Sequence, residues 1–191
     1  MKVGYSVEGS TDRAFIQGLK ERWCPYITLE EGHFRGSTGQ SQRREIDKIC
    51  FELNSKDANL IIFLRDANNE DWKVVLKEVL KLCPTEFKHL TIFGVCDRNI
   101  ECWICADVQW IANKTNKSAS EFQTVDPKGV FENAMGITGI DKKEKVISEL
   151  INNAPLETLK NWNRSNPSFN KFYEDLWQYS IAYKCQIENI R

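Results

Sequence analysis

The sequence predicts an α/β protein with a mainly parallel central sheet sandwiched by helices and a helical C-terminal region. Two observations support this fold class. Short apolar runs of strand character alternate with segments of helical periodicity through the first two-thirds of the chain. The run "NLIIFL" is continuously apolar, which is typical of a central parallel strand covered on both faces. Strands that alternate with helices favour a parallel sheet with right-handed crossovers.

Each expected element follows from its local pattern. The expected strands are 2–7, 26–31, 59–64 and 89–95. The expected helices are 12–23, 43–54, 70–83, 100–113, 142–150, 156–162 and 169–181. The glycine-rich stretch "EGHFRGSTGQSQRR" predicts a loop before the second helix. We expect an α/β core over residues 1–120 and a helical extension over 121–191 that packs on it as part of one domain.

Composition limits the classes of protein that the chain can belong to. The 191 residues carry a formal net charge of −1, which gives no global attraction to nucleic acid. No apolar run reaches membrane-span length and no signal-peptide pattern opens the chain, so we expect a cytoplasmic protein without membrane contact. The seven cysteines are odd in number, and we expect reduced core thiols. Cys102 and Cys105 form a CxxC within an apolar helical pattern, which favours packing over metal binding.

Acidic residues follow the three clearest predicted strands. They are Glu8 and Asp12 after the first, Asp66, Glu70 and Asp71 (with Asn68 among them) after "NLIIFL", and Asp97 and Glu101 after "TIFGV". In a parallel sheet the carboxyl ends of the strands meet at one edge, where ligands usually bind. Any one of these positions is more simply an ordinary turn residue. Taken together, Glu8 and Asp66 favour a site for a hard cation such as Mg²⁺, which prefers oxygen ligands.

At these residues the chain resembles the Toprim fold, in which a Glu follows the first strand and an Asp-x-Asp pair follows a later buried strand. "VEGSTDRAFI" is similar to the Glu element and "LIIFLRDAN" to the Asp element. More narrowly, the chain resembles a group of small bacterial Toprim-like proteins related to the OLD nucleases, the DUF4276 group. That narrower resemblance rests on "VEGSTDRAF", "FLRDAN", "IECWICADVQWI", "DPKGVFE" and "NPSFNKFYEDL", which occur in this order over nearly the whole chain.

The resemblance implies a site that holds one or two Mg²⁺ or Mn²⁺ ions. Glu8 would act as metal ligand or general acid/base, Asp66 as the main metal ligand and catalytic residue, and Asn68 as a secondary ligand. Glu101 would hold a second metal or orient water. Substrate phosphate would meet the helix N-terminus at Gly9, Ser10 and Thr11 and the cations Arg65 and Arg98. We expect Gly9 to allow a sharp turn and to leave room for phosphate because it has no Cβ.

One position departs from the Toprim pattern. Asn68 stands where the family has its second Asp, and an amide oxygen carries no charge, so metal affinity should fall. Either Asp71 or Glu101 compensates, or catalysis is weakened or absent. In the glycine-rich stretch, His33, Arg35, Arg43 and Arg44 are further candidates for substrate contact, although a plain surface position is the simpler interpretation for each.

Two functions follow from the resemblance. The first is a metal-dependent phosphodiesterase, a nuclease on DNA or RNA, acting as effector of an antiviral or foreign-DNA defence system together with an ATPase partner. The alternative is a catalytically degenerate Toprim-like subunit that regulates or scaffolds an ATPase complex. A homo-oligomer is compatible with both functions.

Overall fold

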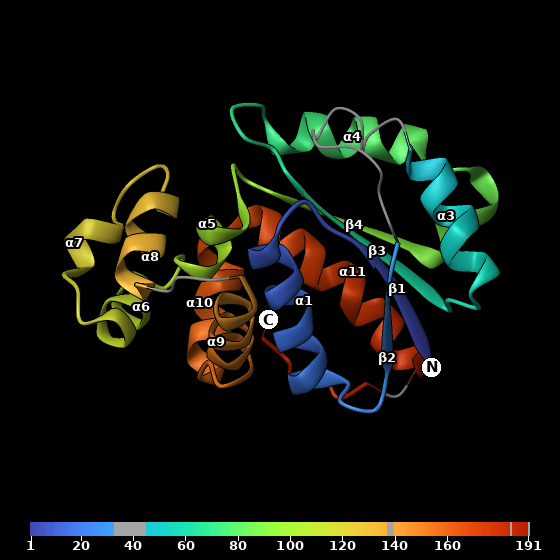
Figure 1. Ribbon diagram of the computed structural model, residues 1–191. Helices are drawn as coiled ribbons and strands as arrows, with labels where there is room; N and C mark the ends of the chain where they lie inside the picture. The colour runs from blue at the N-terminus through green and yellow to red at the C-terminus, as the bar shows by residue number, and fades with distance from the viewer. Residues whose placement is uncertain (33–44, 137–139, 184, 191) are drawn as a thin grey trace.

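The computed structural model describes residues 1–32, 45–136, 140–183 and 185–190 and is shown in Figure 1. Within these residues the sheet has four strands: β1 (Lys2–Ser6), β2 (Thr28–Glu31), β3 (Leu60–Asp66) and β4 (Thr91–Cys96). The strand order is β2-β1-β3-β4 and every pair is parallel. The predicted α/β class with a parallel sheet between helices is therefore confirmed.

The helices alternate with the strands and then dominate the C-terminal region. They are α1 (Ser10–Trp23), α3 (Ile46–Ser55), α4 (Trp72–Leu82), the 3₁₀ helix η1 (Thr85–Leu90), α5 (Ile100–Ile104), α6 (Val108–Thr115), α7 (Ala119–Phe122), α8 (Lys128–Met135), α9 (Ile140–Asn152), α10 (Leu156–Ser165) and α11 (Pro167–Tyr183). Among the described residues, none of these helices is long and apolar enough to span a lipid bilayer.

The sheet separates two apolar clusters. Alternate residues of β1, β3 and β4, including Val3, Ile62 and Ile92, face α1, α5 and the C-terminal helices. Ile61 and Phe93 belong to the other cluster, together with the buried faces of α3 and α4. Figure 1 shows the two layers, with α3 and α4 on one side of the sheet and α1 and α11 on the other. Burial on both faces explains why "NLIIFL" is continuously apolar.

The predicted helix over 100–113 was wrong in its continuity. The chain forms α5, turns at residues 105–107 and begins again as α6. The break has a local cause, because the Asp107 carboxylate accepts a hydrogen bond from the Trp110 N–H at 3.1 Å and so caps a new helix. The α7 and α8 helices, which the sequence pattern did not predict, follow α6.

The α9 helix packs directly along α1, which joins the C-terminal region to the core. At Gly18, in the middle of α1, an added Cβ would lie 2.6 Å from the Ile151 Cβ and 2.7 Å from the Ser148 carbonyl oxygen. Both of these neighbouring atoms are fixed by the backbone of α9. The close approach of the two helices therefore depends on a residue without a side chain at position 18.

The Gly18→Ala substitution is expected to lower the free energy of unfolding by about 1 to 3 kcal/mol, because α9 must move away from α1. Gly129→Ala in α8 is the matched control, since an added Cβ there meets nothing within 4 Å. Urea unfolding of both variants measures the difference. Equal stabilities of the two variants would show that α1 and α9 are not packed this closely.

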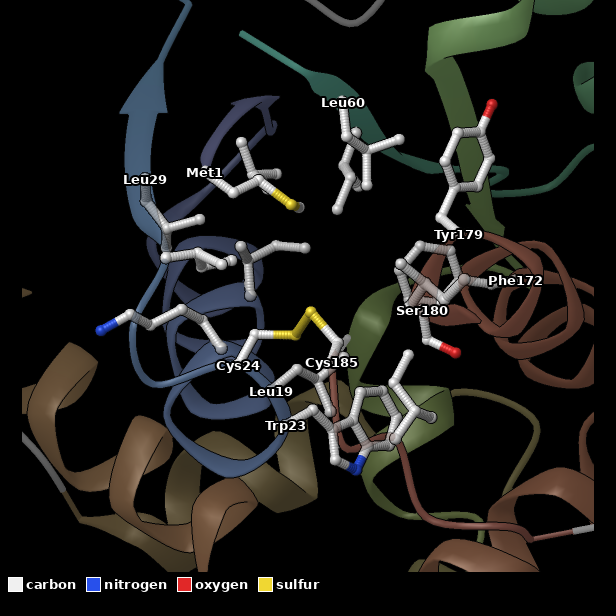
Figure 2. Close-up of a pocket in the computed structure, with 17 residues that line it drawn as sticks. Met1, Leu19, Trp23, Cys24, Leu29, Leu60, Phe172, Tyr179, Ser180 and Cys185 are labelled. Carbon is white, nitrogen blue, oxygen red and sulfur yellow. A yellow bond between two sulfur atoms is a disulfide. The ribbon is translucent and has the colours of Figure 1, made fainter. Parts of the chain in front are cut away.

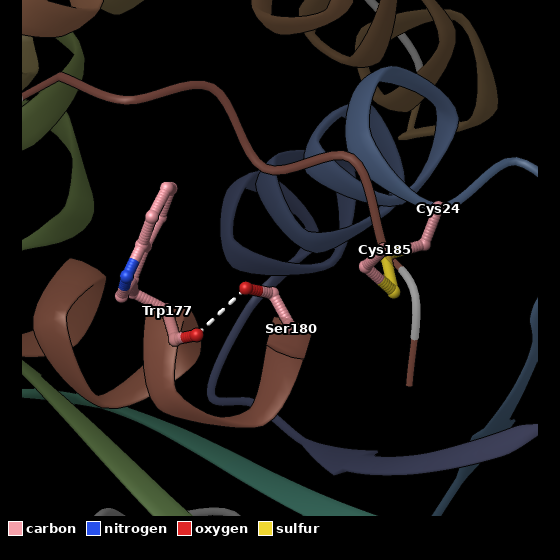
Figure 3. The surroundings of a disulfide bond; sticks show 4 residues. All are labelled: Cys24, Trp177, Ser180 and Cys185. Carbon is pink, nitrogen blue, oxygen red and sulfur yellow. Dashed lines mark hydrogen bonds between the residues drawn. A yellow bond between two sulfur atoms is a disulfide. The ribbon is translucent and has the colours of Figure 1, made fainter. Parts of the chain in front are cut away.

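The cysteine prediction was wrong at two of the seven positions. Cys24, after the end of α1, forms a disulfide with Cys185, which lies 161 residues further along the chain. The other five cysteines are free. Figure 3 shows the crosslink beside the last turns of α11, where the Ser180 hydroxyl donates to the Trp177 carbonyl. The sequence pattern of apolar positions gave no sign of this pairing because both partners also fit a core.

The crosslink and several hydrogen bonds fix the C-terminal segment, residues 185–190. The Gln186 N–H donates to the Trp23 carbonyl at 3.0 Å, and Arg22 forms an ion pair with Glu188. The Tyr173 hydroxyl donates to the Glu188 carbonyl at 2.8 Å. The last turn of α1 is thus joined to the end of the described chain by polar contacts as well as by the disulfide.

An apolar cavity of about 60 Å³ lies beside the disulfide. Figure 2 shows side chains from the first strand, α1 and α11 around it, with Leu60 and Met1 at the amino ends of the strands. This edge of the sheet is opposite to the edge where Glu8 and Asp66 lie. The cavity is therefore separate from the candidate site described next.

Candidate functional site

A polar cavity of about 390 Å³ opens at the carboxyl edge of the sheet. Its lining comes from the segment after β1, the start of α1, the end of β3, the start of α5, and α8 and α9. The lining residues are Glu8, Gly9, Ser10, Thr11, Asp12, Asp66, Asn68, Ile100, Glu101, Lys128, Glu132 and Lys143. The cavity thus contains the three carboxylates that the sequence predicted as metal ligands.

Strand order explains why Glu8 and Asp66 meet. β1 and β3 are neighbours in the sheet, with Ser6 paired to Phe63, so both strands end at the same edge. Glu8 comes two residues after β1, and Asp66 is the last residue of β3. Glu101 comes from the first turn of α5 and is only 2% exposed. The expectation that these three lie together is therefore met.

The start of α5 is fixed by side-chain hydrogen bonds. The Asn99 side chain caps the helix by accepting from the Cys102 N–H at 3.3 Å. In the next turn the Trp103 indole N–H donates to the Ser168 hydroxyl of α11 at 2.7 Å. These contacts hold the short helix against α11, and Glu101 is held at the cavity with it.

Asp12 is a fourth carboxylate of the cavity; the sequence placed it after the first strand but not among the predicted metal ligands. It is 5% exposed, and its Oδ2 accepts from the Gly9 N–H at 2.7 Å. The Gly9 N–H that was predicted to receive phosphate is therefore already bonded to a carboxylate. Gly9 has an extended backbone, and an added Cβ would only touch Asp12 at 3.5 Å, so the expectation that the turn itself requires glycine was wrong.

The carboxylates oppose one another's ionisation. Burial, followed by the charges of Asp12, Glu8 and Glu101, raises the pKa of Asp66 to about 8. Burial and the charge of Glu101 raise the pKa of Asp12 to about 7, although the Gly9 N–H acts in the opposite direction. Burial also raises the pKa of Glu101. Carboxylates grouped in this way are destabilising for the fold unless a proton or a cation compensates the charge.

Asn68 lies on the rim of the cavity, where the backbone sets its position. Its φ of 55° is left-handed, a conformation that Asn tolerates better than most residues. Its N–H donates to the Arg98 carbonyl at 2.8 Å, and its side-chain amide donates to the Asp66 carbonyl at 3.4 Å. Asn68 is therefore near the carboxylates, and its backbone conformation gives a structural reason for an amide residue at this position.

The two arginines that were predicted to contact phosphate do not line the cavity. Arg65 is 2% exposed, and its guanidinium donates to the Leu64 carbonyl at 2.8 Å and to the Ser6 carbonyl at 3.3 Å. Arg98 donates to the Asn69 side chain at 3.2 Å and borders a different hollow. In this conformation Arg65 lies within the fold beside the cavity, where its charge lowers the pKa of Asp12.

Among the described residues, the cations that line the cavity are two lysines from the C-terminal region, Lys128 and Lys143. Glu101 and Asp66 raise the pKa of Lys128, whereas its partial burial acts in the opposite direction. Lys143 of α9 forms an ion pair with Glu132 at 3.0 Å, and both residues line the cavity. Sequence reasoning missed these residues as site residues, although Lys128 lies in the motif "DPKGVFE".

Lys128 is positioned by the loop before α8. The Asp126 carboxylate accepts from the Lys128 N–H at 3.1 Å and from the Asn99 side chain at 2.9 Å. One carboxylate therefore connects the start of α8 to the start of α5. This contact brings the predicted helical extension to the site, which is built from both parts of the chain.

The side chains of the cavity have the right chemistry for a hard cation, but in this structure they are not arranged around a single point. Carboxylate oxygens are the ligands that Mg²⁺ prefers, and the buried Asp66 Oδ1 has no hydrogen-bond partner. Within the described ranges, however, no three His, Cys, Asp or Glu side chains are grouped closely enough to hold a metal ion. The residues therefore fit a magnesium ion by chemistry, and binding requires side-chain rotation within the cavity.

His33, Arg35, Arg43 and Arg44 fall outside the described residues. The CxxC cysteines are both free, and Cys105 is buried in the core, which agrees with the predicted packing role.

Comparison of the chain with family models, with curated proteins and with solved structures found no match in any of the three.

Proposed function

We propose that this protein is a Toprim-type, metal-dependent phosphodiesterase that acts as a nuclease on DNA or RNA. The single observation that carries the proposal is the group of buried carboxylates at the carboxyl edge of a parallel sheet, among them Asp66 with an unpartnered oxygen. Such a group destabilises the fold in the absence of a compensating ligand, which is typical of a site kept for function. The resemblance of the "VEGSTDRAF" and "FLRDAN" elements to Toprim proteins supplies the reaction class.

The residues of the cavity have distinct roles in this proposal. Asp66, Glu8 and Glu101 would hold one or two divalent ions, with Asn68 as a neutral secondary ligand. The ion would supply Lewis-acid activation of a phosphodiester. Asp12, whose carboxylate accepts the Gly9 N–H at the start of α1, would add a further negative charge beside the bound ion. Lys128 would contact a substrate phosphate, since it lines the cavity and its charge interacts with both Asp66 and Glu101.

A catalytically degenerate subunit of an ATPase complex is the second candidate function. Two observations favour it: the neutral Asn68 stands at the position of the second Asp, and the described carboxylates are not grouped to hold an ion. In that case the cavity would be a remnant, and the protein would regulate or scaffold its partner.

The biological setting is part of the proposal and rests on the family resemblance. We propose a cytoplasmic effector of antiviral defence that works with an ATPase partner. The Cys24–Cys185 disulfide is the observation that argues against a reducing compartment, where such crosslinks are rare. Thiol titration of the protein freshly isolated from its host would show whether the crosslink exists there.

A nuclease assay separates the two functions. The wild-type protein, with and without the product of a neighbouring ATPase gene, is incubated with single- and double-stranded DNA and RNA in Mg²⁺ or Mn²⁺. Cleavage that EDTA abolishes supports the phosphodiesterase. The absence of cleavage on every substrate, even with the partner present, would favour the regulatory subunit.

A further inference from the structure

A second surface, outside the acidic cavity, combines exposed apolar side chains with lysines. It is a shallow hollow of about 470 Å³, which we call the lysine hollow. Its lining residues are Trp72, Lys73, Leu76, Lys77, Leu80, Lys81, Lys88 and Lys171. Most come from α4, one from η1 and one from α11. The α4 and α11 helices cover opposite faces of the sheet beside the edge strand β4, as Figure 1 shows, so the hollow lies at the open edge of the sheet.

The apolar side chains form a row along α4. Trp72, Leu76 and Leu80 are spaced at i, i+4 and i+8, which places them on one side of the helix over about 12 Å. Leu80 is 44% exposed, and Trp72 and Leu76 are only partly buried. The buried face of α4 uses other residues, Val75 and Val79, to pack on the core. Trp72 and Leu76 also pack partly against the core cluster under α4, whereas Leu80 is exposed, so the row is only partly covered.

Every charged residue that lines the hollow is a lysine. Lys73, Lys77 and Lys81 repeat the i, i+4, i+8 spacing beside the apolar row, and Lys73 lies over the Trp72 ring at 5.7 Å. Among the described residues, Lys77 and Lys81 have no ion pair, whereas Lys171 is paired with Asp175 at 2.5 Å. The protein as a whole has a net charge of −1, so this concentration of positive charge is local.

We propose that the lysine hollow binds an acidic amphipathic helix of a partner protein. The row of three apolar side chains over two turns matches the i, i+4, i+8 anchors of such a helix. The flanking lysines complement acidic residues on either side of those anchors, which would steer the encounter and fix the register. The proposal rests on the hollow alone and does not depend on nuclease activity at the acidic cavity.

Other occupants fit the hollow less well. Nucleic acid is bound through phosphate contacts and aromatic stacking platforms, but Trp72 is the one aromatic residue in the lining and two leucines form the rest of the apolar row. An added β-strand would require an exposed backbone, and no residue of β4 lines the hollow. An anionic membrane is matched by apolar groups that project outward, whereas these lie in a hollow between two helices and η1.

The test uses the full-length protein and a synthetic peptide of about 18 residues with leucines on one helical face and glutamates beside them. Fluorescence anisotropy measures the Kd, and amide chemical shifts map the contact. We expect shifts along α4, and a Kd that rises at least about tenfold in the Lys77→Glu/Lys81→Glu variant. A peptide of the same composition with its leucines scattered around the helix should bind at least about tenfold more weakly.

The matched control is Lys114→Glu/Lys145→Glu, which makes the same change in charge at exposed lysines outside the hollow. Its Kd should stay within about twofold of the wild-type value. An equal loss in the control variant, or no binding at about 1 mM peptide, would overturn the proposal. It would also be overturned if duplex DNA or phosphatidylserine vesicles bound more tightly than the peptide and lost binding in the Lys77→Glu/Lys81→Glu variant.

Discussion

The Asp66→Ala variant is expected to lose metal-dependent cleavage by about 1,000-fold, because it removes the main oxygen ligand of the proposed site. Asp66 ends the central strand β3, and its Oδ1 is buried without a hydrogen-bond partner. Glu8→Gln keeps the shape of the side chain and removes its charge, so we expect a smaller loss of about 100-fold. The measurement is single-turnover cleavage of a labelled substrate in saturating Mn²⁺.

Glu70→Gln is the matched control for this experiment. Glu70 is an exposed acidic residue in the loop that follows Asp66, and it is not among the residues that line the cavity. Its cleavage rate should stay within about twofold of the wild-type rate. Cleavage that persists in both Asp66→Ala and Glu8→Gln would remove the acidic cavity from the mechanism.

The Asp66→Asn variant is expected to be more stable than the wild type by about 2 to 3 kcal/mol at pH 8 in EDTA, since it removes a buried charge. Burial and three neighbouring carboxylates raise the pKa of Asp66 from 3.8 to about 8 in the folded protein. At pH values between 3.8 and about 8, the folded state binds more protons at Asp66 than the unfolded state does. The contribution of Asp66 to the free energy of unfolding of the wild type therefore falls as the pH rises through this window.

The sign of the effect gives a clear test. The stability gain of Asp66→Asn should grow as the pH rises from 3.8 to about 8, between the usual pKa of the carboxyl and its pKa in the folded protein, and should disappear below about pH 3, where the carboxyl is mostly protonated in both states. Urea unfolding at several pH values between these limits measures it, with Glu70→Gln as the control that should change little. A variant that is less stable than the wild type at pH 8 would show that the Asp66 carboxylate makes favourable contacts, which contradicts the account.

Much of the site could be predicted from the sequence because strand direction is a topological property. Once β1 and β3 were recognised as buried parallel strands, their carboxyl ends had to meet at one edge, and Glu8 and Asp66 lie there. Glu101 followed by the same argument from β4. The break between α5 and α6 was harder to predict. The cap at Asp107, which divides the predicted helix over 100–113, competes locally with an apolar pattern that continues through it.

The parts that were missed depend on contacts between distant residues. Lys128 reaches the cavity because Asp126 joins α8 to α5, and no periodic pattern encodes that contact. The Cys24–Cys185 disulfide links positions 161 residues apart, and the spacing of cysteines in a chain does not reveal their pairing. The role expected of Gly9 failed for a different reason, because its backbone is extended and the Asp12 carboxylate takes its N–H.

A crystal soaked in Mn²⁺ shows directly whether the acidic cavity binds a divalent cation. We expect an anomalous density peak in contact with carboxylate oxygens of both Glu8 and Asp66, and no peak at this place in a crystal of Asp66→Ala. Manganese density only at other positions, or an empty cavity at saturating Mn²⁺, would contradict this expectation.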